Sequence, residues 1–307
     1  MKTNYNRTVQ ACFIGYVVQA IVNNFVPLLF LTFQGSYGIS LQKITLLVTF
    51  NFGIQLLVDL ASIGFVDRIG YRASMILAHA MAAAGLILLT VLPECLGDPF
   101  VGLLIAVMIY AIGGGLLEVL VSPVVEACPT DNKEKAMSLL HSFYCWGHVG
   151  VVLISTIFFS TFGIENWKIL TRIWAVIPVL NGIVFLTSPI YSLHEEGEKG
   201  LSIKELCSMK IFWVVMLMMT CAVCGFSVGI MWPGTFSIAS ASIRGGGTAM
   251  FALLALAGDL GCSGGPTLAG FVSSSVGNNL RMGILAAIVF PVLLLMGIQI
   301  CKKSQEN

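Results

Sequence analysis

Three polar side chains share one face of a long apolar segment. Asn51, Gln55 and Asp59 follow one another at intervals of four residues, which places side chains on the same side of an α-helix. Asp59 falls about seven residues, or roughly 10 Å, inside the polar end of this segment. A buried carboxyl can carry a proton or hold a cation, and buried amides can bind hydroxyl groups. Plain hydrogen bonding between neighbouring helices would use the same residue types.

Other apolar segments carry polar stripes of the same kind. The fourth segment contains Gly114, Glu118 and Ser122 at four-residue spacing, with Glu118 near its middle. Because a carboxyl is costly to bury in hydrocarbon, it usually faces a protein interior or a water-filled cavity. We therefore expect several helices to contribute to one polar interior. The remaining members are Gln19, Asn23 and Asn24 on the first segment and Ser138, His141, Cys145 and His148 on the fifth.

The segments that carry these stripes are long enough to cross a membrane. Apolar residues make up 57% of the 307 residues and charged residues only 10%, whereas a soluble domain carries about 25% charge. A bilayer requires about 20 apolar residues per helix, so we expect an all-α integral membrane protein with about nine spans. The expected spans are 9–33, 44–66, 73–93, 100–127, 137–162, 168–190, 211–240, 248–273 and 282–301.

The cysteines and histidines do not indicate an enzyme, a metal site or a cofactor. Cys221 and Cys224 have redox or metal spacing, but they lie in an apolar helix without a second pair, so we interpret them as packing residues. His141 and His148 are two helical turns apart rather than one, which does not suit a shared metal ligand set. An intramembrane enzyme that uses these histidines and Asp59 is the weakest alternative. The net charge of +1 and the absence of a basic tract argue against a nucleic-acid partner.

One polar segment divides the chain. We expect 1–190 to form an N-terminal six-helix bundle, 191–210 a cytoplasmic central loop, and 211–307 a truncated C-terminal bundle. Basic residues flank alternate span ends, and because such residues favour the cytoplasm, the N-terminus is predicted to be cytoplasmic. We expect a multi-pass protein of the cell (plasma) membrane. The residues that set this orientation are Lys2, Arg7, Arg68, Arg72, Lys133 and Lys135, with Lys168 and Arg172 as exceptions on the outer side.

The loop after the second span has a recognisable pattern. It reads Asp67-Arg68-Ile-Gly70-Tyr-Arg72, and this run resembles the signature loop between helices 2 and 3 of the major facilitator superfamily. The resemblance implies a gating loop in which the acid and the arginines hold the cytoplasmic helix ends. Gly70 would allow the tight turn. The upstream glycine, Gly64, lies one residue closer to Asp67 than the pattern has it.

The fourth span resembles a narrower family. Its run from Gly113 through Glu118 to Ser122-Pro123 is similar to helix 4 of the fucose/proton symporter family, as are Asn23 and Asn24 on the first span. The resemblance implies that Glu118 is linked to proton transfer. It also implies a coupling aspartate three residues after Asn24, where this chain has Pro27. Asp59, or a cation other than H⁺, would then take part in coupling.

These patterns favour secondary active transport of a small polar solute, with a carbohydrate as the expected substrate and H⁺ as the expected coupling ion. Amides pair with hydroxyls as donor and acceptor together, and Trp146 and Tyr144 could stack on a sugar, although core packing would also explain both aromatics. The substrate would bind between the two halves. The alternatives are a non-transporting remnant, including one that needs a partner subunit, and an efflux transporter of apolar compounds. The expected binding residues are Gln19, Asn23, Asn24, Asn51, Gln55, His141 and Trp146, with Glu118, Asp59 and Asp259 for ion coupling.

The second half is too short for six helices. Transporter halves of this type are repeats, and 112–123 matches 223–233 at an offset of about half the usual length, so about three helices are absent. Residues 211–240 read as a hybrid of helices 7 and 10, followed by helices 11 and 12. At about 45 Å this run is too long for one straight span, so we expect a bend near Gly225, Gly229 or Pro233. A naturally compact nine-helix protein is the alternative.

Overall fold

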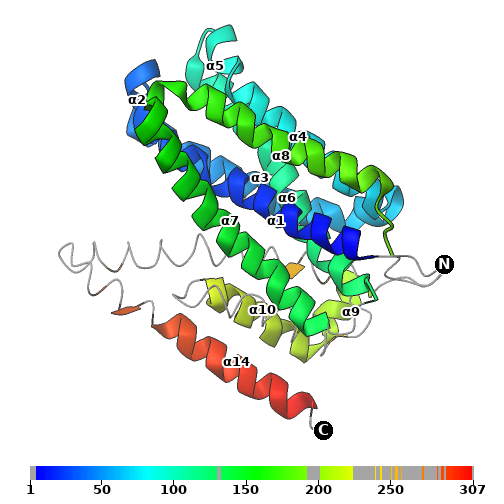
Figure 1. Cartoon of the computed structure of the whole chain (residues 1–307). Coiled ribbons are helices and arrows are strands. Elements are labelled where there is room, and N and C mark those ends of the chain that lie inside the picture. The colour runs from blue at the N-terminus through cyan, green and yellow to red at the C-terminus, as the bar shows by residue number, and fades with distance from the viewer. Residues whose placement is uncertain are drawn as a thin grey trace. The chain divides into compact units, whose positions relative to one another are not determined.

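The computed structural model describes residues 5–129, 133–191, 201–223 and 288–305, together with single positions between 239 and 286. Throughout these residues the regular secondary structure is helical (Figure 1). The helices are α1 (Asn6–Asn24), η1 (Val26–Leu29), α2 (Phe30–Tyr37), α3 (Leu41–Ile69), α4 (Tyr71–Leu89), α5 (Leu92–Cys95), α6 (Pro99–Ala127), α7 (Lys133–Phe162), η2 (Ile164–Asn166), α8 (Trp167–Thr187), α9 (Ile203–Ser208), α10 (Lys210–Val223) and α14 (Val289–Gln305).

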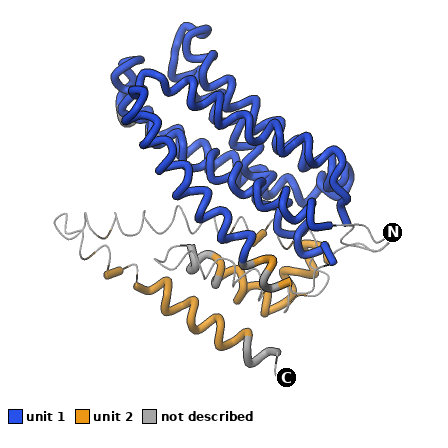
Figure 2. The backbone as a smooth tube through the Cα atoms, in the orientation of Figure 1, with its two compact units in different colours: residues 1–131, 139–192 blue, residues 132–138, 193–307 orange. Residues whose placement is uncertain are grey.

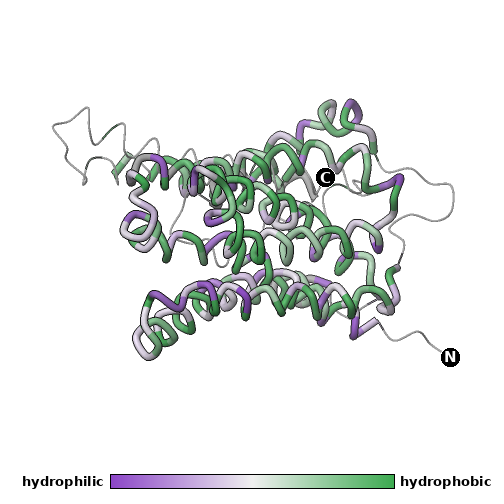
Figure 3. Tube along the Cα trace, turned by 90° about the horizontal axis from the view of Figure 1, so that it is seen from above, coloured by the Kyte–Doolittle hydropathy of each residue, from purple (hydrophilic) through white to green (hydrophobic). Residues whose placement is uncertain are grey.

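Six stretches of the described chain are long and apolar enough to span a membrane: Asn6–Tyr37, Leu46–Ile69, Tyr71–Leu89, Pro99–Ala127, Leu139–Phe162 and Ile164–Thr187. Hydrophobic residues dominate these helices along their length (Figure 3). Large apolar side chains such as Ile169, Ile173 and Val176 on α8 are exposed, which suits contact with acyl chains. The prediction of an all-α membrane protein is confirmed. A shorter apolar helix, Val289–Cys301, lies near the C-terminal end of the described chain.

The chain divides into two compact units (Figure 2). Unit 1 contains residues 1–131 and 139–192 and includes the six spans. Unit 2 contains residues 132–138 and 193–307, and within it α10 packs against α14. Most of the expected hybrid helix, including the bend sites Gly225, Gly229 and Pro233, lies outside the described residues. Cys224 also lies outside them, whereas Cys221 falls within α10.

The first span is interrupted where proline follows the polar stripe. Pro27 lacks a backbone N–H and is the second residue of the 3₁₀ turn η1, which lies between α1 and α2. The second span begins with Ser40, whose side chain accepts a hydrogen bond from the Lys43 backbone N–H at 3.4 Å. Asp98 caps α6 in the same way through the Phe100 N–H, at 2.9 Å. These caps fix where each span begins.

Three consecutive glycines allow α6 to contact three different helices. A Cβ atom at Gly113 would lie 2.5 Å from the Ala78 carbonyl oxygen on α4. At Gly114 it would lie 2.9 Å from a methyl group of Val22 on α1, and at Gly115 it would lie 3.0 Å from Cα of Gln55 on α3. Successive residues of a helix point about 100° apart, so each glycine faces its own neighbour. Glu118 follows less than one turn later and is therefore held among these helices.

The end of α4 and the beginning of α8 are joined by polar contacts. Lys168 forms an ion pair with Glu94, and the Arg172 side chain donates to the Thr90 hydroxyl at 3.3 Å. These two cations are the ones that the expected orientation would place on the outer side. Each has a local partner on the segment that joins α4 to α6.

The start of unit 2 carries a capped helix, α9. Ser202 and Glu205 form a reciprocal capping box, in which the Ser202 N–H donates to the Glu205 carboxylate at 2.7 Å. Hydrogen bonds from the Ser202 side chain and backbone lower the pKa of Glu205 below its usual value.

Candidate functional site

Two pairs of buried polar side chains connect α1 to α6. The Gln19 Nε2 donates to the Glu118 Oε2 at 2.8 Å, and 4% of Gln19 and 6% of Glu118 are exposed. The Tyr16 hydroxyl lies 2.8 Å from the Ser122 hydroxyl, and both residues are buried. The earlier residue on α1 pairs with the later residue on α6, so the two helices run antiparallel here. The carboxyl of Glu118 thus faces a neutral amide inside the bundle.

Asn23 connects the end of α1 to α3. Its Oδ1 accepts hydrogen bonds from the Asn51 Nδ2 at 3.1 Å and from the Gln55 Nε2 at 2.8 Å. Its own Nδ2 donates to the Tyr144 hydroxyl on α7 in a long bond of 3.5 Å. The amide oxygens of Asn51 and Gln55 are buried and have no hydrogen-bond partner. Each such buried acceptor costs about 1–3 kcal/mol unless a donor reaches it.

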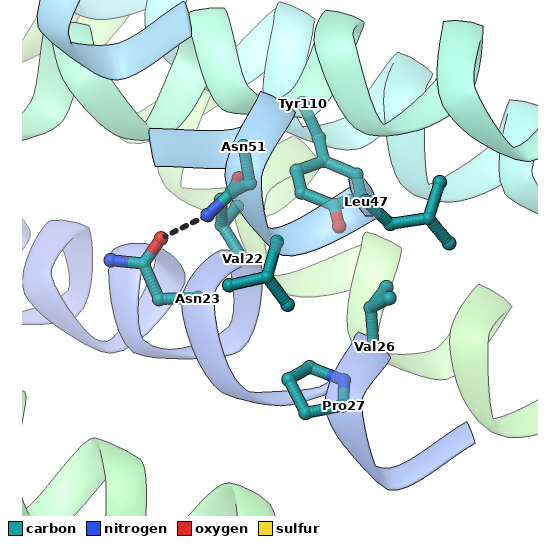
Figure 4. A pocket seen from close by; sticks show the side chains of 8 residues that line it. Val22, Asn23, Val26, Pro27, Leu47, Asn51 and Tyr110 are labelled. Carbon is teal, nitrogen blue, oxygen red and sulfur yellow. Dashed lines mark hydrogen bonds between the residues drawn. The ribbon is translucent and has the colours of Figure 1, made fainter. Parts of the chain in front are cut away.

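A small cavity adjoins this amide cluster of Asn23, Asn51 and Gln55 (Figure 4). Its volume of about 10 Å³ is close to the space that one water molecule needs. Asn51 and Tyr110 line it from above and Pro27 lies at its opposite side in the view. The Tyr110 hydroxyl points toward the cavity. An amide residue and a hydroxyl group therefore both border this space.

His141 on α7 and Asp59 on α3 are also buried. The His141 ring lies 5.1 Å from the Tyr16 ring, centroid to centroid. Asp59 is fully buried on α3, and its backbone carbonyl accepts a hydrogen bond from the Ser62 hydroxyl at 2.7 Å. The stripe that begins at Asn51 therefore faces the protein interior along its whole length.

Two other expected residues have different surroundings, and a third is not described. Trp146 is 72% exposed, so its ring is not part of the buried polar interior. The Asn24 Nδ2 donates to the Ala20 carbonyl of its own helix at 2.9 Å, so this amide is used locally. Asp259 lies outside the described residues.

The loop between α3 and α4 turns at Gly70, which has φ 84°, a conformation that favours glycine. Asp67 and Arg68 are exposed at the end of α3. The Arg72 Nη1 donates to the carbonyl oxygens of Phe185 at 3.0 Å and Leu186 at 2.8 Å. Arg72 thus caps the carboxyl end of α8 within unit 1.

Several interior residues were not singled out from the sequence. Tyr16 lies three residues before Gln19, a spacing that could have placed it on the same polar face. His79 and Asn181 form a buried pair, with Asn181 Nδ2 2.8 Å from His79 Nε2, and Asn181 also donates to the Ala11 carbonyl at 2.9 Å. The sequence feature that could have indicated this pair is the presence of an amide and an imidazole inside long apolar segments. These contacts join α1, α4 and α8.

Within the described residues no group of three or more His, Cys, Asp or Glu side chains could hold a metal ion. The buried side chains in that same part of the chain include no lysine or arginine. The interior of unit 1 is therefore rich in amides, hydroxyls and carboxyls. It suits hydrogen bonding to a polar solute and the binding of a proton.

Comparison with known families decides the class of the protein, because residues 12–300 match the Major Facilitator Superfamily. The chain is a member of the Major Facilitator Superfamily. No curated protein matches it in sequence.

Solved structures of the Major Facilitator Superfamily share the fold at low identity. The transporter FucP in an outward conformation is 15% identical with a TM-score of 0.71, over 97% of this chain and 99% of that chain. The proton:xylose symporter XylE bound to 6-bromo-6-deoxy-D-glucose is 11% identical with a TM-score of 0.69, over 94% and 95% of the two chains. The human organic anion transporter TETRAN is 12% identical with a TM-score of 0.66, over 98% and 100%. The expected superfamily is confirmed, and the protein is a multi-pass membrane protein.

Proposed function

We propose that this member of the Major Facilitator Superfamily is a secondary active transporter of a small polar solute, with a sugar as the solute and a proton as the coupling ion. The single observation that carries the proposal is the buried Glu118 carboxyl, hydrogen-bonded to Gln19 beside a cluster of amides. Solved structures with this fold include a fucose:proton symporter of E. coli and a proton:xylose symporter. Those substrates support the choice of a sugar.

The solute would bind to the amide cluster. The oxygens of Asn51 and Gln55 are buried acceptors without a donor, and Asn23 and Asn51 line the small cavity. A solute hydroxyl could donate to such an acceptor and accept from a neighbouring amide N–H. Gln19 and His141 would form the deeper wall, while Asn24 and Trp146 would contact the solute only after a change of conformation.

Glu118 would bind and release the coupling proton. The Gln19 side chain that bonds to it is an amide, which can hydrogen-bond to either protonation state of a carboxyl. Pro27 occupies the position where the symporter family has a second acid, so Asp59, fully buried on α3, is the proposed second acid. Asp259 is a further candidate from the C-terminal half.

The remaining parts take supporting roles in this proposal. Asp67, Arg68, Gly70 and Arg72 would form the gating loop at the cytoplasmic side of the plasma membrane, with the N-terminus also cytoplasmic. Residues 1–190 would act as the complete six-helix bundle, 191–210 as the central loop, and 211–307 as the truncated second bundle. Alternating access would then depend on a shortened partner for unit 1.

The test is uptake of labelled sugars into proteoliposomes under an imposed pH gradient. We expect accumulation against the sugar gradient, and we expect Glu118→Gln to lose accumulation by at least about tenfold while keeping exchange of solute without a gradient. Glu126→Gln, a carboxyl change on the same helix, is the matched control and should keep accumulation. Normal insertion without uptake or exchange in the wild type, across a panel of sugars, would contradict transport and favour a non-transporting remnant.

A further inference from the structure

Gln19 occupies a position between the proposed proton site and the proposed solute site. Its side chain reaches Glu118 on α6, and four residues later on the same helix Asn23 holds Asn51 and Gln55 of α3. Four residues correspond to about one helical turn, roughly 6 Å along α1. One rigid turn of helix therefore separates the residue that contacts the carboxyl from the residue that organises the amides.

The side-chain amide of glutamine has one group that donates hydrogen bonds, the NH₂, and one that accepts them, the C=O. Its NH₂ donates to an ionised carboxylate, which can only accept. A protonated carboxyl can donate a hydrogen bond through its O–H, and the amide oxygen is the acceptor that suits it. The amide can present that oxygen by turning about its terminal bond, with no covalent bond made or broken. The structure shows the first arrangement, in which the Gln19 Nε2 donates to Glu118.

We propose that Gln19 is a positioning residue that senses the protonation state of Glu118 through the orientation of its amide and passes that state along α1 to Asn23. The proton itself binds to and leaves the Glu118 carboxyl, and Gln19 neither gains nor loses one. Reversal of the amide changes the contact between α1 and α6, and Asn23 moves with α1. The inference rests on the proposed function, because it assigns the residue that couples the two sites.

Other titratable groups surround this contact and belong in its interpretation. Tyr16, also on α1, lies within electrostatic range of Glu118, and His141 of α7 packs against the Tyr16 ring. On the other helices that pack against α6, the buried titratable groups are Asp59 of α3 and His79 of α4. The Tyr16–Ser122 contact provides a natural comparison. It joins the same two helices one turn away, yet it makes no bond to the carboxyl.

The test uses infrared titration of the purified full-length protein in liposomes, following the carboxyl band that disappears in Glu118→Gln. Gln19→Met keeps the size and flexibility of the side chain but removes the donor that favours the ionised carboxylate. We expect the midpoint of this band to move upward by about one pH unit, since hydrogen bonds to charged groups are among the stronger ones. Tyr16→Phe removes the other contact and should leave the midpoint within about 0.3 pH unit of the wild type.

Transport measurements supply the second readout. In Gln19→Met we expect accumulation driven by the pH gradient to fall about tenfold or more, and by a larger factor than solute exchange without a gradient. A Gln19→Met midpoint equal to that of the wild type would overturn the inference, as would an equal shift in Tyr16→Phe. If Gln19→Met does not insert, Gln19→Leu takes its place with the same expected shift. A wild type that never transports, but whose Glu118 band still shifts in Gln19→Met, would overturn the proposed function and the coupling while upholding the sensing of the proton by Gln19.

Discussion

At the scale of single residues, Asn23 joins polar groups from three helices. It accepts from Asn51 and Gln55 on α3 and donates to Tyr144 on α7. Asn24, its neighbour in the chain, bonds only to its own helix through the Ala20 carbonyl. Asn23 therefore connects helices, whereas Asn24 bonds within one helix. The two adjacent asparagines form a matched pair for mutation.

We predict that Asn23→Ala lowers the thermal unfolding temperature of the detergent-solubilised protein by several degrees. The change removes the acceptor shared by two buried amide donors, and each donor left without a partner costs about 1–3 kcal/mol. Asn24→Ala should change the unfolding temperature by no more than about 1 °C, because its bond is local and half-exposed. Equal effects of the two substitutions, measured by dye-based thermal unfolding, would show that Asn23 does not join α1 to α3 in this way.

At the scale of secondary-structure elements, α6 is the helix around which unit 1 is built. The glycines at positions 113, 114 and 115 face α4, α1 and α3 in turn. Backbone atoms of α4 and α3 approach Gly113 and Gly115, and a Val22 methyl group of α1 approaches Gly114. Such close packing of small residues is a common basis for helix association in membranes. It places Glu118 beside α1, where Gln19 can reach it.

Gly113→Ala is therefore predicted to be strongly destabilising. The new methyl group would lie 2.5 Å from the Ala78 carbonyl oxygen, and backbone atoms cannot move away as a flexible side chain can. Overpacking of this kind typically costs about 1–3 kcal/mol. Gly53→Ala, on α3 where nothing lies within 4 Å, is the matched control and should be neutral or slightly stabilising. The yield of monodisperse protein and its unfolding temperature distinguish the two variants.

At the scale of the whole molecule, an even number of spans precedes the central polar segment. Six membrane-spanning stretches lie between residues 6 and 187, so the beginning of α1 and the end of α8 are on the same side of the membrane. The short segment between α4 and α6 is then on the opposite side. Cys95 lies in that segment and Cys207 in α9, and both are exposed.

We predict that a membrane-impermeant maleimide labels Cys95 in intact cells and labels Cys207 only after the membrane is opened. Each cysteine would be tested as the single cysteine of an otherwise cysteine-free protein. This outcome follows from six spans and a cytoplasmic N-terminus. Labelling of both positions in intact cells would contradict the even number of spans, and the reverse pattern would contradict the orientation.

The sequence predicted the first six spans because apolar length is a local property of the chain. It also predicted that Asn51, Gln55 and Asp59 share a buried face, because helical periodicity is local too. It could not predict that Asn51 and Gln55 both donate to Asn23, since amide orientation depends on the distance between helices. Nor could spacing show that Asn24 would bond within its own helix. Tyr16 escaped notice because a tyrosine in an apolar segment looks like a packing residue until its hydroxyl partner is known.

The glycine run on α6 has a mechanical consequence. Backbone atoms of α4 and α3 and a side chain of α1 meet this helix at three consecutive residues, so α4 and α3 cannot slide along it without a clash. A displacement of α6 that starts at Glu118 should therefore move its neighbouring helices as well. We expect α3, α4 and α6 to tilt together as one rigid body.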